Sequence, residues 1–211
     1  VALGEGINGI FQDLMVDQIV DGGQTMNPSI QDLAQAAEAT HAKNVFILPN
    51  NTNIILAAQQ ASELTEKNVI VLPTKSVPMG ISAMLAFSPE MSVEENTAAM
   101  TEAAENVHTA SITYAVRDTT YDDREIHQGD IMGMIDNKLS VLGDNIHQVG
   151  LDVTAMMVNE DSGLITVYYG SDVTEDDADK LVDALADAYP DCDVEKPYGG
   201  QPLYYYLIAV E

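Results

Sequence analysis

The first part of the chain repeats a short apolar run followed by an amphipathic segment. The apolar runs are continuous rather than alternating, which is typical of strands buried on both faces of a parallel sheet. Helices would then cover the sheet on both sides. The runs expected as strands are VAL, QIV, NVFILP and NVIVLP, and the segments expected as helices are residues 4–15, 29–40, 50–64 and 74–87.

The pattern changes at residue 88. Ser92 and Glu95 form a capping-box sequence in front of an amphipathic segment, and SITYAVR then alternates with a period of two, as a half-exposed strand does. Further elements follow: hairpins over 119–143, a helix around 145–158, the strand GLITVYY, a helix over 174–188 and the strand PLYYYLIAV. We therefore expect an α/β chain in two parts. A parallel sheet with flanking helices would occupy residues 1–88, and an acidic α+β part with a mixed or antiparallel sheet would occupy 89–211.

The charge of the chain narrows the classes of partner. Its 211 residues include 34 acidic and 8 basic side chains, and most of the acidic excess falls in the second part. Such a field repels nucleic acid and anionic membrane surfaces, so we expect neither nucleic-acid binding nor membrane insertion. No apolar run reaches the roughly 18 residues that span a bilayer. The single Cys192 excludes an internal disulfide and fits a cytoplasmic location. Because the chain starts with Val1 instead of Met, we expect a piece of a longer protein.

A glycine motif near the start resembles a dinucleotide-binding loop. Gly4, Gly6 and Gly9 follow the first strand in the spacing G-x-G-x-x-G, and Asp21 ends the next strand, where a ribose-binding carboxylate would stand. Two features weigh against a nucleotide. The intervening helix is short, and Glu5 puts a negative charge inside the expected phosphate cradle.

Polar loops follow the strands of the first part. In open α/β sheets, ligands or partners bind beyond the carboxyl ends of the strands. The same residue types also cap helices and shape turns, so a binding surface and a purely local role both stay open. The candidate residues are Gly22, Gly23, Gln24, Thr25, Asn50, Asn51, Asn53, Lys75 and Ser76.

Other candidate chemistry finds little support in the sequence. The acidic run Asp118, Asp122, Asp123, Glu125 and Asp130 does not have the spacing of a calcium-binding loop. The histidines are scattered, and Cys192 lies between two aspartates that disfavour its thiolate. We expect no catalytic residue, no metal site and no cofactor in this fragment.

The chain ends in the segment YGGQPLYYYLIAVE. Tyr204 and Tyr206 are expected on one face of the final strand and Tyr205 on the other. They are either half-buried sheet residues or an aromatic contact surface for a partner.

Four segments together resemble a known family over essentially the whole chain: ILPNNTNIILAAQQA, VIVLPTKSVPMGISAMLAF, TYAVRDTTYDD and YGGQPLYYYLIAVE. They look like the C-terminal region of YloV-like proteins, the kinase subunit of bacterial fatty acid kinase, related to dihydroxyacetone kinases. The resemblance implies a two-subdomain fold similar to that of DegV-type fatty-acid-binding proteins. It also implies that ATP and Mg²⁺ bind on kinase domains outside this fragment.

The resemblance also suggests a change of function at the strand ends. DegV-type proteins hold the acyl carboxylate with hydroxyl side chains, whereas Gly22, Gly23, Asn50 and Asn51 stand at the matching positions here. The resemblance therefore implies a non-catalytic domain that docks the DegV-type carrier for acyl phosphate formation and has lost lipid binding. The alternative is a domain that binds a nucleotide or a fatty acid with its strand-end loops.

Overall fold

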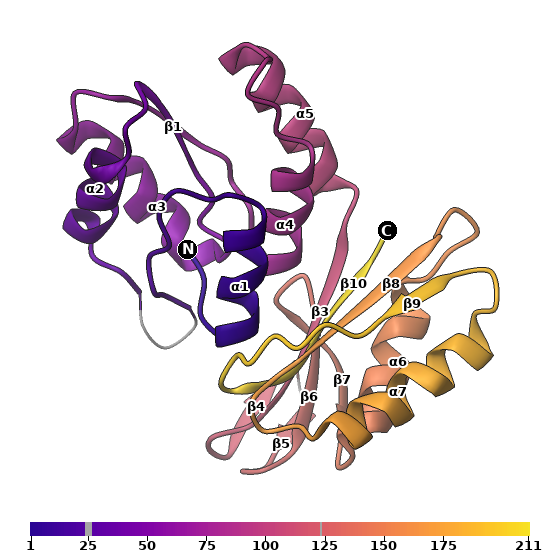
Figure 1. Cartoon of the computed structure of the whole chain (residues 1–211). Coiled ribbons are helices and arrows are strands. Elements are labelled where there is room, and N and C mark those ends of the chain that lie inside the picture. The colour runs from indigo at the N-terminus through magenta and orange to yellow at the C-terminus, as the bar shows by residue number, and fades with distance from the viewer. Residues whose placement is uncertain (24–26, 123) are drawn as a thin grey trace. The chain divides into compact units, whose positions relative to one another are not determined.

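The computed structural model describes residues 1–23, 27–122 and 124–211. The chain folds into two compact units, Val1–Val107 and His108–Glu211 (Figure 1). Within the described residues, no helix combines the length and the apolar character that a membrane crossing needs.

Unit 1 is built from parallel strands and the helices packed on them (Figure 1). Strand β1 (Asn44–Ile47) pairs in parallel with β2 (Asn68–Val71). The first residues extend this arrangement, since Ala2 forms a parallel bridge with Asp21. The helices are α1 (Glu5–Asp13), α2 (Ile30–Ala39), α3 (Thr52–Ala61), α4 (Val77–Leu85) and α5 (Val93–Glu105), with a 3₁₀ turn η1 (Ser62–Leu64) after α3. The expected parallel α/β arrangement is confirmed.

Side-chain caps set the start of several helices. Ser29 accepts a hydrogen bond from the backbone N–H of Asp32, and the Asp32 carboxylate accepts one from the backbone of Ser29. Ser92 and Glu95 form the same reciprocal pair at α5. These bonds satisfy N–H groups that a helix start leaves without partners, so short local sequences set where the two helices begin.

Helix α5 belongs to unit 1, and the division between the units falls after it. The sequence suggested a boundary at residue 88, whereas the structure divides the chain between Val107 and His108. The buried Asn96 explains the difference: its side chain donates to the carbonyls of Ser88 and Met91 and accepts from the N–H of Ser88. The loop before α5 is thereby fixed to the helix, and α5 in turn packs on α4.

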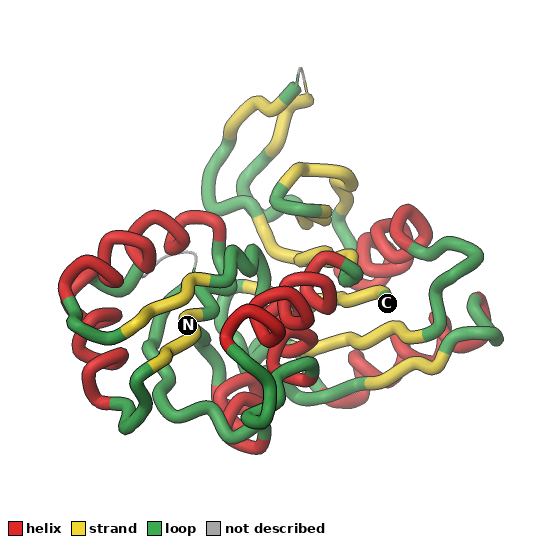
Figure 2. Tube along the Cα trace, turned by 90° about the horizontal axis from the view of Figure 1, so that it is seen from above, coloured by secondary structure: helices red, strands yellow, loops and turns green. Residues whose placement is uncertain are grey.

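Unit 2 is a six-stranded mixed sheet with two helices on one face (Figure 1). Strands neighbour each other in the order β7-β6-β3-β10-β8-β9, and every pair is antiparallel except β8 with β9. A small hairpin of β4 and β5 extends away from this sheet (Figure 2). The strands are β3 (His108–Tyr114), β4 (Thr119–Tyr121), β5 (Arg124–Ile126), β6 (Ile131–Ile135), β7 (Lys138–Gly143), β8 (Leu164–Tyr169), β9 (Asp193–Glu195) and β10 (Tyr204–Val210). The expected mixed sheet is confirmed, although no sequence pattern predicted β9.

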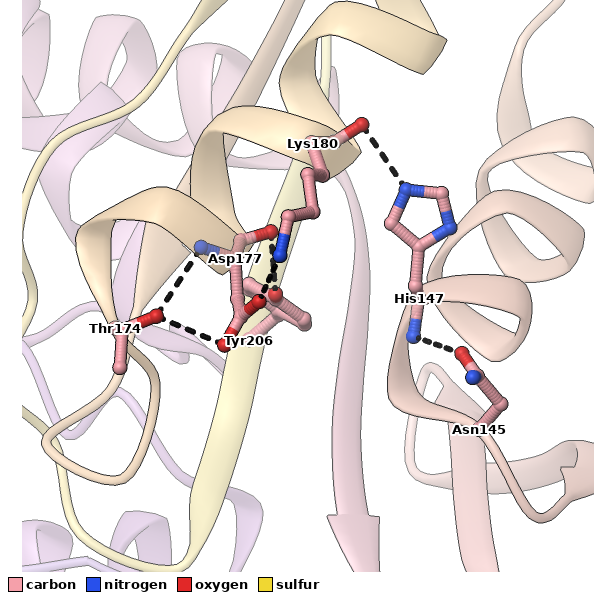
Figure 3. A network of polar contacts seen from close by, with 6 residues as sticks. All are labelled: Asn145, His147, Thr174, Asp177, Lys180 and Tyr206. Atoms are coloured by element: carbon pink, nitrogen blue, oxygen red, sulfur yellow. Dashed lines mark hydrogen bonds and ion pairs between the residues drawn. The ribbon is translucent and has the colours of Figure 1, made fainter.

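Helices α6 (Ile146–Met157) and α7 (Glu175–Ala188) are tied to each other and to the sheet. A ring nitrogen of His147 lies 3.0 Å from the Lys180 carbonyl oxygen, and Tyr206 of β10 donates to the Asp177 carbonyl at 3.4 Å (Figure 3). Their apolar faces bury Val153, Leu181 and Leu185 against the sheet, so this core belongs to unit 2.

Candidate functional site

The polar loops of unit 1 converge at one edge of its sheet. Strands β1 and β2 run in parallel and in register, with Ile47 opposite Val71. The loops that follow them therefore leave the sheet side by side, and α3 and α4 begin there. This is the edge at which open α/β sheets bind ligands.

Asn50 holds this edge together. Its side chain is 7% exposed, donates to the Val1 carbonyl at 2.9 Å and accepts from the Thr74 hydroxyl at 2.8 Å. Its backbone N–H donates to the same hydroxyl at 3.0 Å. A Cβ at Gly80 would overlap the Asn50 amide, so that amide rests on the backbone of α4. Asn50 joins three chain segments and has the local role that the sequence did not reveal.

The neighbouring polar side chains largely serve the helix starts. Asn51 caps α3 by accepting from the N–H of Asn53, and Ser76 caps α4 by accepting from the N–H of Met79. The side chains of Asn53 and Lys75 point to solvent. Among the described residues, no carboxylate forms an ion pair with Lys75. Lys75 is therefore the cation at this edge that a partner could still contact.

The loop after the second apolar run is tightly packed where it is described. A Cβ at Gly22 would overlap the side chains of Val1 and Pro28, so the turn needs glycine there. At Gly23 a Cβ would meet ordinary contacts with Leu3. The candidates Gln24 and Thr25 lie outside the described residues.

The glycine motif does not form a phosphate cradle. Gly4 precedes α1 with a backbone φ of 122°, which favours glycine, but Gly6 and Gly9 lie inside the helix. Nothing lies within 4 Å of a Cβ placed on Gly9, so no close approach of other groups requires glycine there. Glu5 occupies the first turn of α1, where a pyrophosphate would have to bind.

The acidic residues around the β4–β5 hairpin shape its turns. Asp118 accepts from the N–H of Gln128 at 2.7 Å, and Asp130 accepts from the N–H of His127 at 2.7 Å. Asp123 lies outside the described residues. In the part of the chain that the structure describes, no group of three or more histidine, cysteine or acidic side chains is arranged to hold a metal ion.

The C-terminal tyrosines lie in the middle of a sheet. Strand β10 has β3 on one side and β8 on the other, so its backbone offers no free edge. Tyr206 is fully buried and out of a partner's reach, while Tyr204 is partly exposed. The register shifts between these two residues, and the ring of Tyr205 lies 5.9 Å from that of Tyr114. The simple alternation expected for these residues is therefore wrong, because a bulge resets it.

Acidic side chains line the exposed side of α7. Asp176, Asp183 and Asp187 are exposed, and within the described residues no basic side chain lies within 4.0 Å of their carboxylates, although Lys180 also attracts Asp176 from a longer distance. Asp177, by contrast, accepts from Lys180 and from Thr174, and these two bonds lower its pKa (Figure 3). The helix thus has a polar cap at its start and exposed carboxylates along its outer side.

Unit 1 also contains an apolar cavity that was not predicted from the sequence. Its volume is about 530 Å³, and twenty of its twenty-five lining residues are apolar. It lies along β1, between α2 and the segment from Phe11 to Val20, with Met84 and Phe87 closing another side. A sequence signal was present in the run Leu14–Val16, which continues the apolar character past the end of α1.

Comparison with known proteins identifies the family. The whole chain, residues 1–211, matches the FakA-like C-terminal family model of fatty acid kinase. Protein YloV of Bacillus subtilis is 39% identical over 211 residues. This match covers all of the present chain and 38% of YloV, so the chain spans well under half of that relative.

Solved structures share the fold at low sequence identity. The fatty acid kinase B3 protein of Streptococcus pneumoniae, solved with linoleic acid, gives a TM-score of 0.62 at 15% identity, over 87% of this chain and 76% of that one. The DegV family protein Cg2579 of Corynebacterium glutamicum gives 0.68 at 14% identity, over 96% and 92%. The dihydroxyacetone kinase of C. freundii gives 0.64 at 14% identity, over 89% and 43%. With the family match over its full length, this chain belongs to the FakA-like C-terminal domain family of fatty acid kinase.

Proposed function

We propose that this chain is a non-catalytic interaction domain that docks a DegV-type fatty-acid carrier for a fatty acid kinase. The family match and the short share of YloV that the chain covers support this assignment. Phosphoryl transfer, ATP and Mg²⁺ would belong to the other domains of the kinase. The carrier would present its fatty acid to those domains while bound here.

The use of the strand-end polar groups is the observation that carries this proposal. The polar side chains at this edge form hydrogen bonds within the protein; they are Asn50, Asn51, Thr74 and Ser76. Gly22 and Gly23 offer no side-chain donor in a place where a carboxylate would need one. The fold is thus kept, while the hydroxyls of Thr74 and Ser76 at this edge bond within the protein instead of to an acid.

Charge suggests how a carrier would approach. Unit 2 contains 21 acidic and 5 basic side chains, counted along residues 108–211, a difference of 16. The exposed carboxylates of Asp176, Asp183 and Asp187 form an acidic surface on α7. We propose this α7 surface as the contact for a carrier with a basic docking face, because complementary charge speeds association.

Surface plasmon resonance with the carrier tests this proposal. Neutralising the α7 surface with Asp176→Asn, Asp183→Asn and Asp187→Asn should lower the association rate constant about tenfold at low salt. Raising the salt from about 50 to 500 mM should lower the rate for the unaltered chain and reduce the difference between the two proteins. A matched control, Asp13→Asn with Glu63→Gln and Glu94→Gln, removes the same charge from exposed sites of unit 1.

Two results would contradict the proposal in different ways. Equal slowing by both triple variants would show general charge attraction rather than an α7 contact. No binding of the unaltered chain to any DegV-type carrier from the same cell would remove the docking function itself.

The alternative of a small molecule held by the strand-end loops has less support. Gly6 and Gly9 are helical, and the amides of Asn50 and Asn51 are engaged. Lys75 could attract an anion there, but no second described cation joins it.

A further inference from the structure

The cavity of unit 1 is larger than packing defects usually are. Protein interiors are close-packed, and voids larger than a water molecule are few. A volume of about 530 Å³ falls in the range of roughly 300–1,000 Å³ that small-molecule sites occupy. Leaving such an apolar space without an occupant forfeits packing energy. Its presence therefore points to a ligand.

Two neighbouring residues of β1 show that the space is open. Phe46 and Ile47 are neighbours on β1, so their side chains point to opposite faces of the sheet. Both are only partly buried, although β1 pairs with β2 inside unit 1. Both contribute to the cavity wall, so the space extends along β1.

The polar side chains in the wall are mostly engaged with the protein. Asn50 bonds to Val1 and Thr74, and Asn44 accepts from Asn68 at 2.9 Å. Thr40 donates to the Ala37 carbonyl at 2.8 Å. None of these side chains is left over to select a ligand head group.

The wall also lacks a positive charge. None of the side chains that line the cavity is a lysine, an arginine or a histidine. The nearby Lys67 donates to carbonyls at the end of α2. Asp17 and Gln18, both exposed, line the cavity, and among the described residues no cation pairs with Asp17. An anionic head group at this rim would meet a carboxylate without a compensating charge.

Met15 supplies an independent sign of an apolar entrance. It lines the cavity, is 86% exposed and has a φ of 62°, the left-handed region that favours glycine. The N–H of Val16 donates to the Phe11 carbonyl and that of Met15 to the Gln12 carbonyl, which is the helix ending that glycine normally occupies. A flexible apolar side chain at such a place suits contact with an apolar ligand.

We propose that the cavity of unit 1 binds one long alkyl chain whose head group is uncharged. The apolar wall would hold the chain, and the acidic rim would select against a free carboxylate. This site is separate from the proposed docking surface on α7 and does not depend on it.

Titration of the full chain with the neutral, polarity-sensitive dye N-phenyl-1-naphthylamine tests for the site. We expect saturable binding of one dye per chain. Ala36→Trp places a large ring in the cavity wall and should weaken binding at least about tenfold. Ala42→Trp, at an exposed position that also lines the cavity, serves if the first variant does not fold. The control Leu56→Trp alters a residue of α3 that is 63% exposed and does not line the cavity.

The introduced rings also report on the site directly, because the natural chain contains no tryptophan. Lipid addition should shift the emission of the residue-42 or residue-36 variant and leave that of the residue-56 variant unchanged. If neither cavity variant weakens dye binding, or if the control Leu56→Trp weakens it equally, the proposal that the dye binds in the cavity would be wrong.

Displacement of the dye decides the ligand class. Monoolein and oleate carry the same acyl chain, and we expect monoolein to displace the dye at a concentration at least about tenfold lower at pH 8. Equal or better displacement by oleate would overturn the uncharged head group. If monoolein is preferred, Asp17→Asn should reduce the difference between the concentrations at which the two lipids displace the dye. An unchanged difference would exclude Asp17 as the cause of the preference.

Discussion

Asn50 combines an unusual backbone conformation with a buried amide. Its φ is 55°, a region that asparagine enters more easily than most residues. The side chain satisfies Val1 and Thr74 in a place where water cannot replace it. A residue that sequence patterns suggest for binding is here part of the scaffold.

Replacing Asn50 should therefore cost stability. Asn50→Ala removes the bonds to Val1 and Thr74 and puts alanine into a left-handed conformation. We expect a loss of about 2–4 kcal/mol in the free energy of unfolding by urea. The control Asn53→Ala, at an exposed side chain in the following helix α3, should change it by less than about 0.5 kcal/mol. Equal effects of the two variants would contradict the role given to Asn50.

At the scale of elements, the caps show how short sequence signals become stable starts of helices. Hydrogen bonds from the backbone N–H and hydroxyl of Ser92 lower the pKa of Glu95. The ionised form of the Glu95 carboxylate is thus more stable, relative to the protonated form, in the folded chain than in the unfolded one. Its contribution is complete above its ordinary pKa and is lost as the pH falls through the lowered one.

This pKa shift predicts a pH-dependent difference between two variants. Glu95→Gln should destabilise unit 1 at pH 7, and the deficit should shrink as the pH is lowered below 4.5, the ordinary value. Glu94→Gln removes a charge from the same helical turn but no cap. Urea unfolding at several pH values measures the stability of both variants. A loss of stability for Glu95→Gln that stays constant down to pH 3 would contradict the role given to the ionised cap.

Strand β10 gives a prediction about its tyrosines. Tyr206 is fully buried in the core of unit 2, and burial raises its pKa to about 12, so it remains neutral. Tyr206→Ala should cost about 3–5 kcal/mol, because it leaves a large cavity. Tyr206→Phe should cost below about 1 kcal/mol, since the lost hydroxyl bond is long at 3.4 Å. Thermal unfolding checks both, and carrier binding that falls with Tyr206→Phe would instead favour a contact role.

At the scale of the whole molecule, the division into units has a direct consequence. Each unit has its own core, and α5 contributes Met100 and Ala104 to the buried residues of the first. Fragments cut between Val107 and His108 should both unfold cooperatively. Fragment 1–88, which lacks α5, should lose cooperative unfolding because α4 is left without its packing partner. Circular dichroism during heating measures the unfolding of each fragment. If fragment 1–88 were as stable as fragment 1–107, α5 would not be needed for the fold of unit 1 and the boundary would lie near residue 88.

The sequence determined most elements and the family by itself. The caps Ser29 and Ser92 and the apolar runs of β1 and β2 act through neighbours close in the chain, so their signals survive without a tertiary structure. The G-x-G-x-x-G spacing was ambiguous for the opposite reason. Whether Gly6 and Gly9 lie in a loop or in a helix depends on where α1 begins, and the structure places that start at Glu5.

Tertiary structure decided the features that depend on contacts between distant residues. Asn50 meets Val1 and Thr74 across the sheet, the bulge at Tyr204 and Tyr206 resets which faces the tyrosines occupy, and Asn96 joins α5 to unit 1. The cavity along β1 arises because helices and loops from separate parts of the chain leave a space that no single segment encodes. Local patterns specify the elements, whereas burial, register and empty volume are properties of the packed whole.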